Sequence, residues 1–321
     1  MSTPWSIPTK FRYEVSPTIR SWLWSLWLHS PHSVRSFVYR FLARRFGIGH
    51  HGKAYRLPFG VYIKFGLTPD EPLAMDFVRK NTQIPVPAIL DVLSTTVDFD
   101  PPPLNWGTSV SVDQNAFGQP VWWIFVMTTI PGRPLFEDGL GSRLVNATDE
   151  QRMLVQSTVA SWVDQLHAIH PPPNFPPQRV SGFLGGPFQS HRIDTPGVVG
   201  PFETPAEFHA QDFCTVWPDR VEKAEEHIRR FIAERPRRHY QICLTHGDIL
   251  LHNIIADEEC RPTGLIDWET AGWMPEYWET ASSSRSVYSR VYIWKDILHE
   301  AFPQYDDDIA VERLIQLDYV F

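Results

Sequence analysis

Two aspartates and an asparagine interrupt an otherwise apolar stretch at residues 244–269, which reads LTHGDILLHNIIADEECRPTGLIDWE. We interpret it as a loop over 246–251, a strand over 253–256, a turn over 257–263 and a second strand over 264–268. Such a hairpin brings Asn253 and Asp267 to the same end, and Asp248 lies on the loop that leads into that end. Three oxygen-bearing side chains are therefore expected to converge.

These oxygen atoms suit phosphoryl transfer. An Asn amide oxygen and an Asp carboxylate are ligands that Mg²⁺ prefers, and the ion completes its shell with water and substrate phosphates. Asp248 then remains free to accept a hydrogen bond from an attacking hydroxyl. The kinase catalytic loop divides its roles in this way, with the pattern His-x-Asp-x-x-x-x-Asn followed by a metal-binding Asp on the next strand.

A structural interpretation exists for each of these side chains. Asp248 and Asn253 could be ordinary turn residues, and Asp267 could cap the end of a strand. Any one of them alone favours that interpretation. Their joint spacing, with a strand after each polar position, favours a nucleotide and metal site.

The motif HGDILLHN, with IDWE downstream, resembles the aminoglycoside phosphotransferase and choline kinase-like family, whose members are small-molecule relatives of protein kinases. The resemblance covers about residues 47–292. It implies an α+β, two-lobed protein kinase-like fold, with a small antiparallel sheet in the N-lobe and a mostly helical C-lobe. It also implies that Asp248 is the catalytic base and that Asn253 and Asp267 bind Mg²⁺. By the same resemblance, His246 is a structural residue of the loop.

A kinase-like site also needs a lysine on an upstream strand and a glutamate on the next helix. Lys64, in GVYIKFG, is the lysine on the best predicted strand, and Glu71 lies in the helix predicted over 68–81. Glu71 has a second interpretation, because residues 68–71 (TPDE) also have the form of a capping box. Pro72 follows it, where family members more often have a helix former.

The run VWWIFVM at 121–127 is predicted to be a buried strand. Together with the following TTIPGRPL, it resembles the connection between lobes whose backbone hydrogen-bonds adenine in the family. We therefore expect Met127, Thr128 and Ile130 to contact ATP, although relatives commonly have Glu at the position of Thr128. The turn at 49–52 is expected near the phosphates, but it lacks a full G-x-G-x-x-G.

The periodicity divides the chain into three parts: an N-terminal helical extension over 1–46, an N-lobe over 47–130 and a C-lobe over 131–321. Helical spacing in the C-lobe occurs at 153–169, 208–233 and 285–302. Pro and Gly are frequent at 171–204, which is predicted to run over the surface.

The extension includes a basic amphipathic segment at 33–46. Its apolar residues, Val34, Phe37, Val38, Phe41 and Leu42, fall on one helical face, and its arginines lie elsewhere. Helices of this type lie on membranes in some proteins, so contact with a membrane surface through 33–46 is one interpretation. The interpretation we favour is a helix that packs on its own domain, with solvated arginines.

Composition excludes several classes of protein. With 321 residues, 43% hydrophobic residues and a net charge of -8, the chain is globular and lacks the basic footprint of a nucleic-acid-binding protein. Its three cysteines have no metal-ligand spacing, and no secretory signal or membrane-spanning run is recognisable. We expect a cytoplasmic protein with reduced thiols.

The leading hypothesis is an ATP- and Mg²⁺-dependent phosphotransferase that moves the γ-phosphate of ATP to a hydroxyl of a small molecule. A protein kinase is disfavoured, because Trp268-Glu269 replaces Phe-Gly after Asp267 and no Ala-Pro-Glu follows. The alternative is a catalytically weak, kinase-like binding or regulatory protein.

The substrate stays open at this stage. The run at 267–279, DWETAGWMPEYWE, combines aromatic rings with carboxylates and could hold an ammonium group through cation–π and Coulomb attraction. In the other interpretation, its rings pack inside the lobe and its glutamates are solvated. The stretch at 181–204 is a further candidate for substrate contact.

Overall fold

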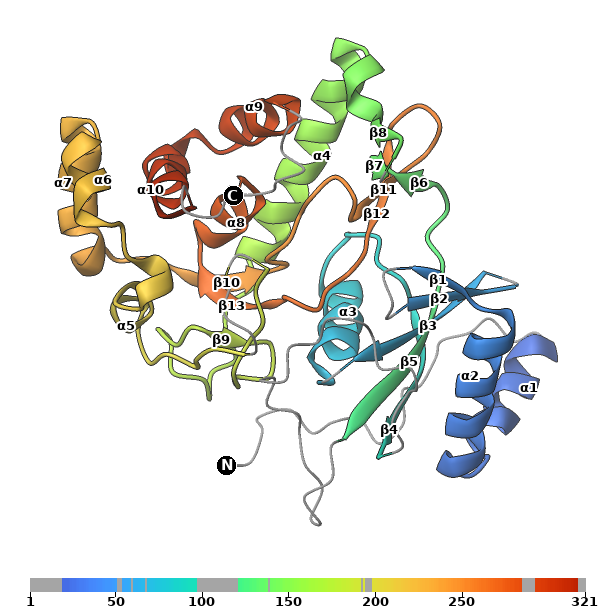
Figure 1. Ribbon diagram of the computed structural model, residues 1–321. Coiled ribbons are helices and arrows are strands. Elements are labelled where there is room, and N and C mark those ends of the chain that lie inside the picture. The colour runs from blue at the N-terminus through green and yellow to red at the C-terminus, as the bar shows by residue number, and fades with distance from the viewer. Residues whose placement is uncertain are drawn as a thin grey trace. The chain divides into compact units, whose positions relative to one another are not determined.

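The computed structural model describes residues 19–50, 54–58, 60–66, 68–96, 121–137, 139–191, 193, 198–284 and 292–316. These residues form two compact units, whose elements are labelled in Figure 1. The sheet unit draws on Trp5–Phe77 and Pro87–Thr129, and the helical unit draws on Val78–Val86 and Ile130–Phe321.

The sheet unit is built on one antiparallel sheet with the order β1-β2-β3-β5-β4. Its strands are β1 (Ile48–His50), β2 (Ala54–Leu57), β3 (Val61–Gly66), β4 (Ile89–Thr95) and β5 (Trp122–Thr128). Strands β1 to β3 confirm the predicted small sheet, and β5 confirms the buried strand. Strand β4 was not predicted, although its burial alternates as it does in a strand with one covered face.

Helix α3 (Asp70–Asn81) follows β3 and confirms the helix predicted there, apart from its first two residues. Acidic side chains occupy its first turn and basic ones its last turn, so both ends complement the helix dipole. In Figure 1, α3 lies on one side of the sheet, and α1 (Ile19–Leu28) and α2 (His32–Phe46) lie on the other.

Helix α2 packs on the sheet through a face that the sequence did not indicate. Its buried residues are Arg35, Ser36, Tyr39 and Ala43. Val34, Phe37 and Phe41 are exposed instead, so the interpretation with a buried apolar face and solvated arginines was wrong for this side of the helix.

A buried carboxylate on β4, Asp91, explains why this face of α2 packs on the sheet. Nη1 of Arg35 donates to its two oxygens at 2.6 and 2.5 Å, and the Tyr39 hydroxyl donates to one of them at 2.8 Å. Nε1 of Trp27 on α1 donates in turn to the Tyr39 hydroxyl at 2.7 Å. Because a buried charge needs a partner, these bonds select the side of α2 that faces the sheet.

The apolar core of this unit lies between α2 and the sheet. It contains Tyr39, Ala43, Ile63, Phe65, Leu93, Ile124 and Val126. Trp24 and Trp27 of α1 are partly buried and pack against this core.

The helical unit contains most of the helices. Its α-helices are α4 (Asp149–His167), α5 (Pro205–His209), α6 (Pro218–Lys223), α7 (Glu226–Glu234), α8 (Trp278–Ser284), α9 (Tyr292–Ala301) and α10 (Asp306–Gln316), and its short 3₁₀ helices are Arg143–Asn146, Asp212–Cys214, Arg235–Arg237 and Pro303–Tyr305. Helix α4 confirms the long helix predicted at 153–169. It begins earlier because Thr148 and Gln151 form a capping box.

The stretch of helical spacing at 208–233 contains the end of α5, a short 3₁₀ helix, α6 and most of α7. Helix α5 ends at His209, and Pro218 begins α6. Proline has no N–H for the preceding turn and therefore favours the first helical position. The predicted segment 285–302 is described from Tyr292, where α9 begins, and its first seven residues lie outside the described residues.

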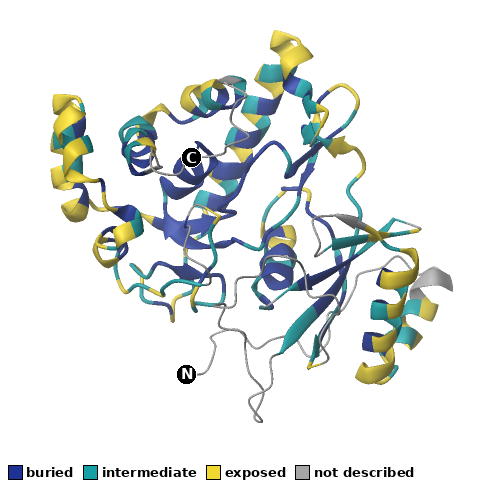
Figure 2. Cartoon of the chain, in the orientation of Figure 1, coloured by how far each residue is buried: buried dark blue, intermediate teal, exposed yellow. Residues whose placement is uncertain are grey.

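Short strands line the middle of the helical unit. One sheet has the order β10 (Ile242–Thr245), β13 (Gly272–Pro275), β9 (Ser181–Gly182), and another has β12 (Pro262–Leu265), β11 (Ile254–Ala256), β6 (Arg133–Pro134). Strands β7 (Phe136–Glu137) and β8 (Gly141–Ser142) pair with each other. Figure 2 shows that β10, β13 and α8 are buried.

Among the described residues, no helix is both long and apolar enough to cross a bilayer. Cys214, Cys243 and Cys260 are free and buried, which agrees with the expectation of reduced thiols.

Candidate active site

Asp248 and Asn253 are held together in the loop between β10 and β11. Nδ2 of Asn253 donates to the backbone carbonyl of Asp248 and to its carboxylate Oδ2, each at 2.9 Å. Both partners are oxygens, so the amide nitrogen must face them and Oδ1 must face away. Among the described residues, no hydrogen-bond donor reaches this Oδ1, although Asn253 is buried.

The predicted hairpin is confirmed by β11 and β12. Ile254 pairs with Leu265, and the Ile266 N–H donates to the Asn253 carbonyl at 3.0 Å. This register places Asp267 at the end of the hairpin where Asn253 lies.

The backbone of Asp267 has a φ of 66°, in the left-handed region that non-glycine residues adopt at a cost. Backbone strain of this kind occurs preferentially at functional sites. Carboxylate oxygens of Asp267 and Glu269 lie within 4.8 Å of each other. The hairpin therefore ends in a group of oxygen atoms.

His246 has both ring nitrogens occupied by the loop itself. Its Nδ1 accepts from the Asp248 N–H at 3.2 Å, and its Nε2 lies 3.0 Å from the Ile266 carbonyl, to which it donates as the neutral tautomer. Burial lowers the pKa of His246 to about 4, so the ring is neutral at pH 7. Its ring also contacts Trp268 edge to face, with centroids 4.5 Å apart. This geometry agrees with a structural role.

Glu279 on α8 anchors the start of the same loop, and the sequence did not indicate this. Its carboxylate accepts the backbone N–H of His246 at 2.5 Å and that of Gly247 at 3.0 and 3.1 Å. Burial raises the pKa of Glu279 to about 7, although these N–H donors oppose the shift. Gly247 has a φ of 80°, and a Cβ there would lie 2.8 Å from the Thr270 carbonyl. Only glycine fits this position without strain.

The charge of Asp248 is stabilised by neighbouring imidazoles. Burial by itself raises the pKa of this carboxyl, but a hydrogen bond with His252 and the charge of His191 outweigh burial and lower the pKa below its usual value. Nε2 of His252 lies 3.7 Å from the Asp248 Oδ2, and Nε2 of His191 lies 3.2 Å from the Glu269 carboxylate. Asp248 is therefore ionised at neutral pH and can accept a proton.

The donor set agrees with a hard divalent cation. Asn253 Oδ1 and the Asp267 carboxylate offer the oxygen ligands that Mg²⁺ prefers, and neither sulfur nor imidazole competes at these two positions. The Asn253 amide oxygen accepts no hydrogen bond from the described residues, so it remains available to a cation.

The sheet unit contains the predicted pair of Lys64 and Glu71. Nζ of Lys64 on β3 donates to Oε1 of Glu71 on α3 at 2.8 Å, and both side chains are only 6% exposed. A buried ammonium without its carboxylate would be strongly disfavoured. The expected ion pair between Lys64 and Glu71 is therefore present.

The end of β5 offers fewer backbone groups for adenine than expected. The Thr128 N–H donates to the Ala88 carbonyl at 2.9 Å, and the Thr129 N–H donates to the Gly60 carbonyl at 3.1 Å. In the part of the chain that the structure describes, the Ile130 N–H has no backbone partner. Of the predicted phosphate turn, residues 51 and 52 lie outside the described residues.

The aromatic run at 267–279 is packed in the core. Trp268, Trp273, Tyr277 and Trp278 are all 0 or 1% exposed, so the interpretation in which these rings hold a substrate ammonium group was wrong. The alternative was also incomplete, because Glu279 is buried and not solvated. The rings bury a large apolar area, which outweighs any use as an open cation site.

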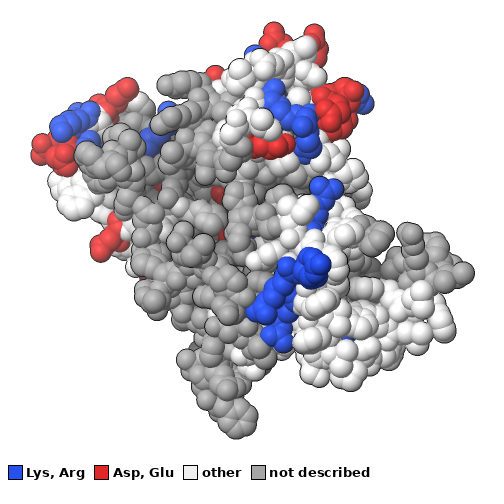
Figure 3. Space-filling view, turned by 45° about the vertical axis from the view of Figure 1, so that its right-hand side comes forward, with Lys and Arg blue, Asp and Glu red and all other residues white. Residues whose placement is uncertain are grey.

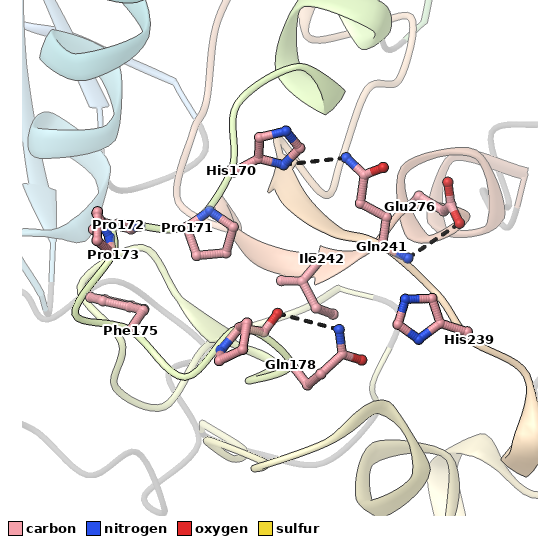
Figure 4. Close-up of a pocket in the computed structure, with 11 residues that line it drawn as sticks. His170, Pro171, Pro172, Pro173, Phe175, Gln178, His239, Gln241, Ile242 and Glu276 are labelled. Carbon is pink, nitrogen blue, oxygen red and sulfur yellow. Dashed lines mark hydrogen bonds between the residues drawn. The ribbon is translucent and has the colours of Figure 1, made fainter.

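A cavity of about 590 Å³ lies at the other end of β10 from this loop. It is lined by Ile242, where β10 begins, whereas the loop follows Thr245, where β10 ends. Figure 4 shows His170 and Glu276 both bonded to Gln241, at 3.4 and 3.3 Å. This cavity is therefore not part of the candidate active site.

The family assignment rests on a match that includes the loop, the hairpin and β5. Residues 121–296, more than half of the chain, match the phosphotransferase enzyme family. The chain belongs to this family. The family resemblance and the α+β, protein kinase-like fold class inferred from HGDILLHN and IDWE are confirmed.

Solved structures similar to this phosphotransferase include aminoglycoside phosphotransferase APH(4)-Ia, with 14% identity, a TM-score of 0.47 and 88% of each chain covered. The aminoglycoside-3'-phosphotransferase of type VIII has 17% identity and a TM-score of 0.45, with 89% of this chain and 98% of that chain covered. APH(3'')-Id from Streptomyces rimosus, in complex with ADP and streptomycin, has 16% identity and a TM-score of 0.45, with 88% and 97% covered. No curated protein matched the chain.

Sequence reasoning about this phosphotransferase missed the side chains that position the loop. Glu279 and Thr270 both bond its backbone, since the Thr270 hydroxyl donates to the His246 carbonyl at 2.8 Å. The sequence carried no clear signal for either residue. Two carboxylates, Glu276 and Glu279, lie in the run EYWETA, and the run does not tell which of them is buried.

Proposed function

We propose that this phosphotransferase transfers the γ-phosphate of ATP, with Mg²⁺, to a hydroxyl group of a small molecule. The observation that carries the proposal is the arrangement at Asn253. Its amide nitrogen holds the Asp248 carboxylate, and its unpartnered oxygen lies at the end of the hairpin occupied by Asp267. One residue thus connects a candidate base to a candidate metal site.

In this proposal Asp248 is the catalytic base. Its lowered pKa keeps it ionised, and Asn253 fixes the carboxylate so that it can accept the proton of the acceptor hydroxyl. His246 and Glu279 are positioning residues, because they bond the loop backbone.

Asn253 and Asp267 would hold Mg²⁺, which neutralises phosphate charge when it is bound. Lys64, oriented by Glu71, would place its ammonium group on the phosphates of ATP. The backbone from Met127 to Ile130 would contact adenine. Because the Thr128 N–H is already bonded, the Ile130 N–H is the better donor within that segment.

The acceptor is proposed to be a small hydroxylated molecule. The buried rings of the 267–279 run exclude an aromatic cage there, so a cationic acceptor would be recognised by carboxylates such as Glu269 rather than by ring faces. We place the reaction in the cytoplasm, where ATP and reduced thiols occur together.

The test is transfer of radiolabel from γ-labelled ATP, with Mg²⁺, to a panel of amino alcohols, amino sugars and other hydroxylated metabolites. With an acceptor in hand, Asp248→Asn should lower turnover by roughly 10²–10⁴, because a general base contributes about that much. Its affinity for ATP should stay unchanged. The exposed His239→Asn serves as the control and should leave turnover unchanged.

Two results would contradict the proposal. If Asp248→Asn lost ATP binding as severely as turnover, Asp248 would not be the base. If the unaltered protein bound ATP and Mg²⁺ but labelled no acceptor in the panel, the catalytically weak, kinase-like binding protein would be the better description.

A further inference from the structure

Helices α1 and α2 present large apolar side chains to solvent. Trp22 on α1 is 64% exposed and Phe37 on α2 is 63% exposed. We define the α1–α2 surface by six exposed residues: Trp22, Leu23, Leu26, Phe37, Phe41 and Phe46. Single exposed apolar residues are common on protein surfaces. A cluster of them on adjacent helices marks an interaction site.

The three phenylalanine rings that α2 contributes to this surface are in contact. The Phe37 and Phe41 rings stack with centroids 6.5 Å apart, and Phe41 meets Phe46 edge to face at 6.4 Å. On α1, Trp22, Leu23 and Leu26 follow the spacing of one helical face. Figure 2 shows exposed residues along the outer side of both helices, away from the sheet.

The opposite faces of both helices pack against the sheet. Tyr39 and Ala43 of α2 lie in the core, and Trp24 and Trp27 of α1 pack against it. The bonds of Arg35 and Tyr39 to Asp91 hold α2 in this orientation. The apolar residues of the α1–α2 surface therefore cannot reach the core by rotation of α2 without leaving Asp91 unpaired.

The segment around this surface is purely basic. Between Glu14 and Asp70 the chain has eight Lys or Arg residues and no acidic residue, although the whole chain has a net charge of -8. Arg44 and Arg45 are exposed in the last turn of α2, and the Arg45 guanidinium lies 5.3 Å from the Phe46 ring centroid. Figure 3 brings forward the side that carries α1 and α2, and the described atoms in its lower right part are mostly white, with no red among them.

We propose that the α1–α2 surface docks on an anionic lipid bilayer. Amphipathic helices with aromatic and Leu side chains on one face and Arg beside them lie in the membrane interface, with the apolar face about 5–10 Å deep. Arg44 and Arg45 would contact lipid phosphates. Their neighbours Phe41 and Phe46 would enter the boundary between the headgroups and the acyl chains. Helices of 10 and 15 residues cannot span a bilayer, which takes about 20.

Charge distinguishes the bilayer from a second copy of the chain. A two-fold contact through this surface would put Arg44 and Arg45 of both copies into one interface, and the chain has no acidic residue between Glu14 and Asp70 to pair with them there. The remainder of the protein is acidic and is repelled by anionic lipid, so the basic segment also sets the orientation of docking.

The test is co-sedimentation of the full chain with phosphatidylcholine vesicles, with and without phosphatidylserine. The protein should sediment with vesicles that contain phosphatidylserine, and higher salt should weaken the partitioning. Phe37→Ser with Phe41→Ser, and separately Arg44→Gln with Arg45→Gln, should each weaken it by roughly tenfold or more. Met153→Ser with Leu140→Ser removes exposed apolar residues of the helical unit and should change nothing.

All four altered positions of α2 are exposed, so the variants should keep the melting temperature of the unaltered protein. Failure to sediment with phosphatidylserine vesicles at low salt would overturn the proposal. Equal sedimentation of the Phe37→Ser, Phe41→Ser variant would overturn it as well. So would a lipid-free dimer in analytical ultracentrifugation that this variant abolishes, because the surface would then join two copies of the chain.

Discussion

Glu279 is the buried carboxylate that fixes the backbone of the predicted catalytic loop. It accepts two consecutive N–H groups, from His246 and Gly247, which would otherwise be unpaired in the interior. Ionisation of this buried carboxyl is unfavourable, because burial raises its pKa from 4.5 to about 7. The loop therefore depends on a group whose charge changes within the physiological pH range.

Glu279→Gln should remove a pH-dependent part of the stability. A raised folded pKa means that the contribution is fully present below the unfolded pKa of 4.5 and is lost as the pH rises through about 7. The free energy of unfolding of the unaltered protein, minus that of the variant, should therefore increase by about 2 kcal/mol from pH 7 to pH 5.

Urea denaturation at several pH values measures this difference. Glu300→Gln, at an exposed position of α9, controls for the loss of one carboxylate. A difference between unaltered protein and Glu279→Gln that stays constant from pH 7 to pH 5 would show that Glu279 does not titrate there.

Asp267→Asn tests the proposal that the side chain of Asp267 is a ligand of Mg²⁺. The change keeps the size of the side chain but removes the charge that a divalent cation needs. ATP binding, measured by calorimetry, should depend on Mg²⁺ in the unaltered protein and lose that dependence in Asp267→Asn. The exposed Glu258→Gln should behave as the unaltered protein does. Identical Mg²⁺ dependence in all three proteins would contradict a metal ligand at Asp267.

At the scale of elements, one buried ion pair decides how α2 meets the sheet. Arg35 and Asp91 are 11% and 7% exposed, and the Tyr39 hydroxyl completes the coordination of the carboxylate. The pair joins two elements that are far apart in the sequence. Its loss should therefore loosen the attachment of the two N-terminal helices.

Asp91→Ala should lower the free energy of unfolding by about 3–5 kcal/mol, because Arg35 would stay buried without a partner. The double change Arg35→Met with Asp91→Leu should recover most of this loss, since it removes both charges. Glu203→Ala breaks the exposed pair with Arg179, 2.6 Å long, and should cost less than about 1 kcal/mol. Urea denaturation measures all three. A loss in Asp91→Ala as small as that in Glu203→Ala would contradict the role given to the pair.

At the scale of the whole molecule, a nucleotide that binds only the folded chain must stabilise it. ATP with Mg²⁺ at a hundred times its dissociation constant should add about 2.7 kcal/mol to the free energy of unfolding. Differential scanning fluorimetry should therefore show a higher melting temperature with ATP and Mg²⁺, and a further rise with an acceptor. Asp267→Asn should lose the part of the shift that needs Mg²⁺. A melting temperature that ATP and Mg²⁺ leave unchanged would argue against the proposed cofactors.

The distribution of charge is also a property of the whole chain. The part of the chain before Asp70 carries net positive charge, and the excess of acidic residues lies after it. This asymmetry supports docking of the basic segment on an anionic surface. Carboxylates such as Asp248 and Asp267, which belong to the helical unit, would not take part in that contact.

The sequence by itself determined the parts that depend on short spacings. The hairpin that joins Asn253 to Asp267 and the long helix α4 follow from residue types a few positions apart, whereas the pair of Lys64 and Glu71 was expected from the kinase-like pattern. Local hydrogen bonding and side-chain periodicity specify such features, so they can be predicted without knowledge of the rest of the chain.

Only the tertiary structure decided which faces are buried and what holds the loop. The apolar stripe of α2 is outward because Asp91, 56 residues from Arg35, attracts the opposite side of the helix. The aromatic run after Asp267 became core, and Glu279 became an anchor for backbone N–H groups 32 and 33 residues away. Burial and pairing of charges depend on residues distant in the sequence, and local patterns do not report those contacts.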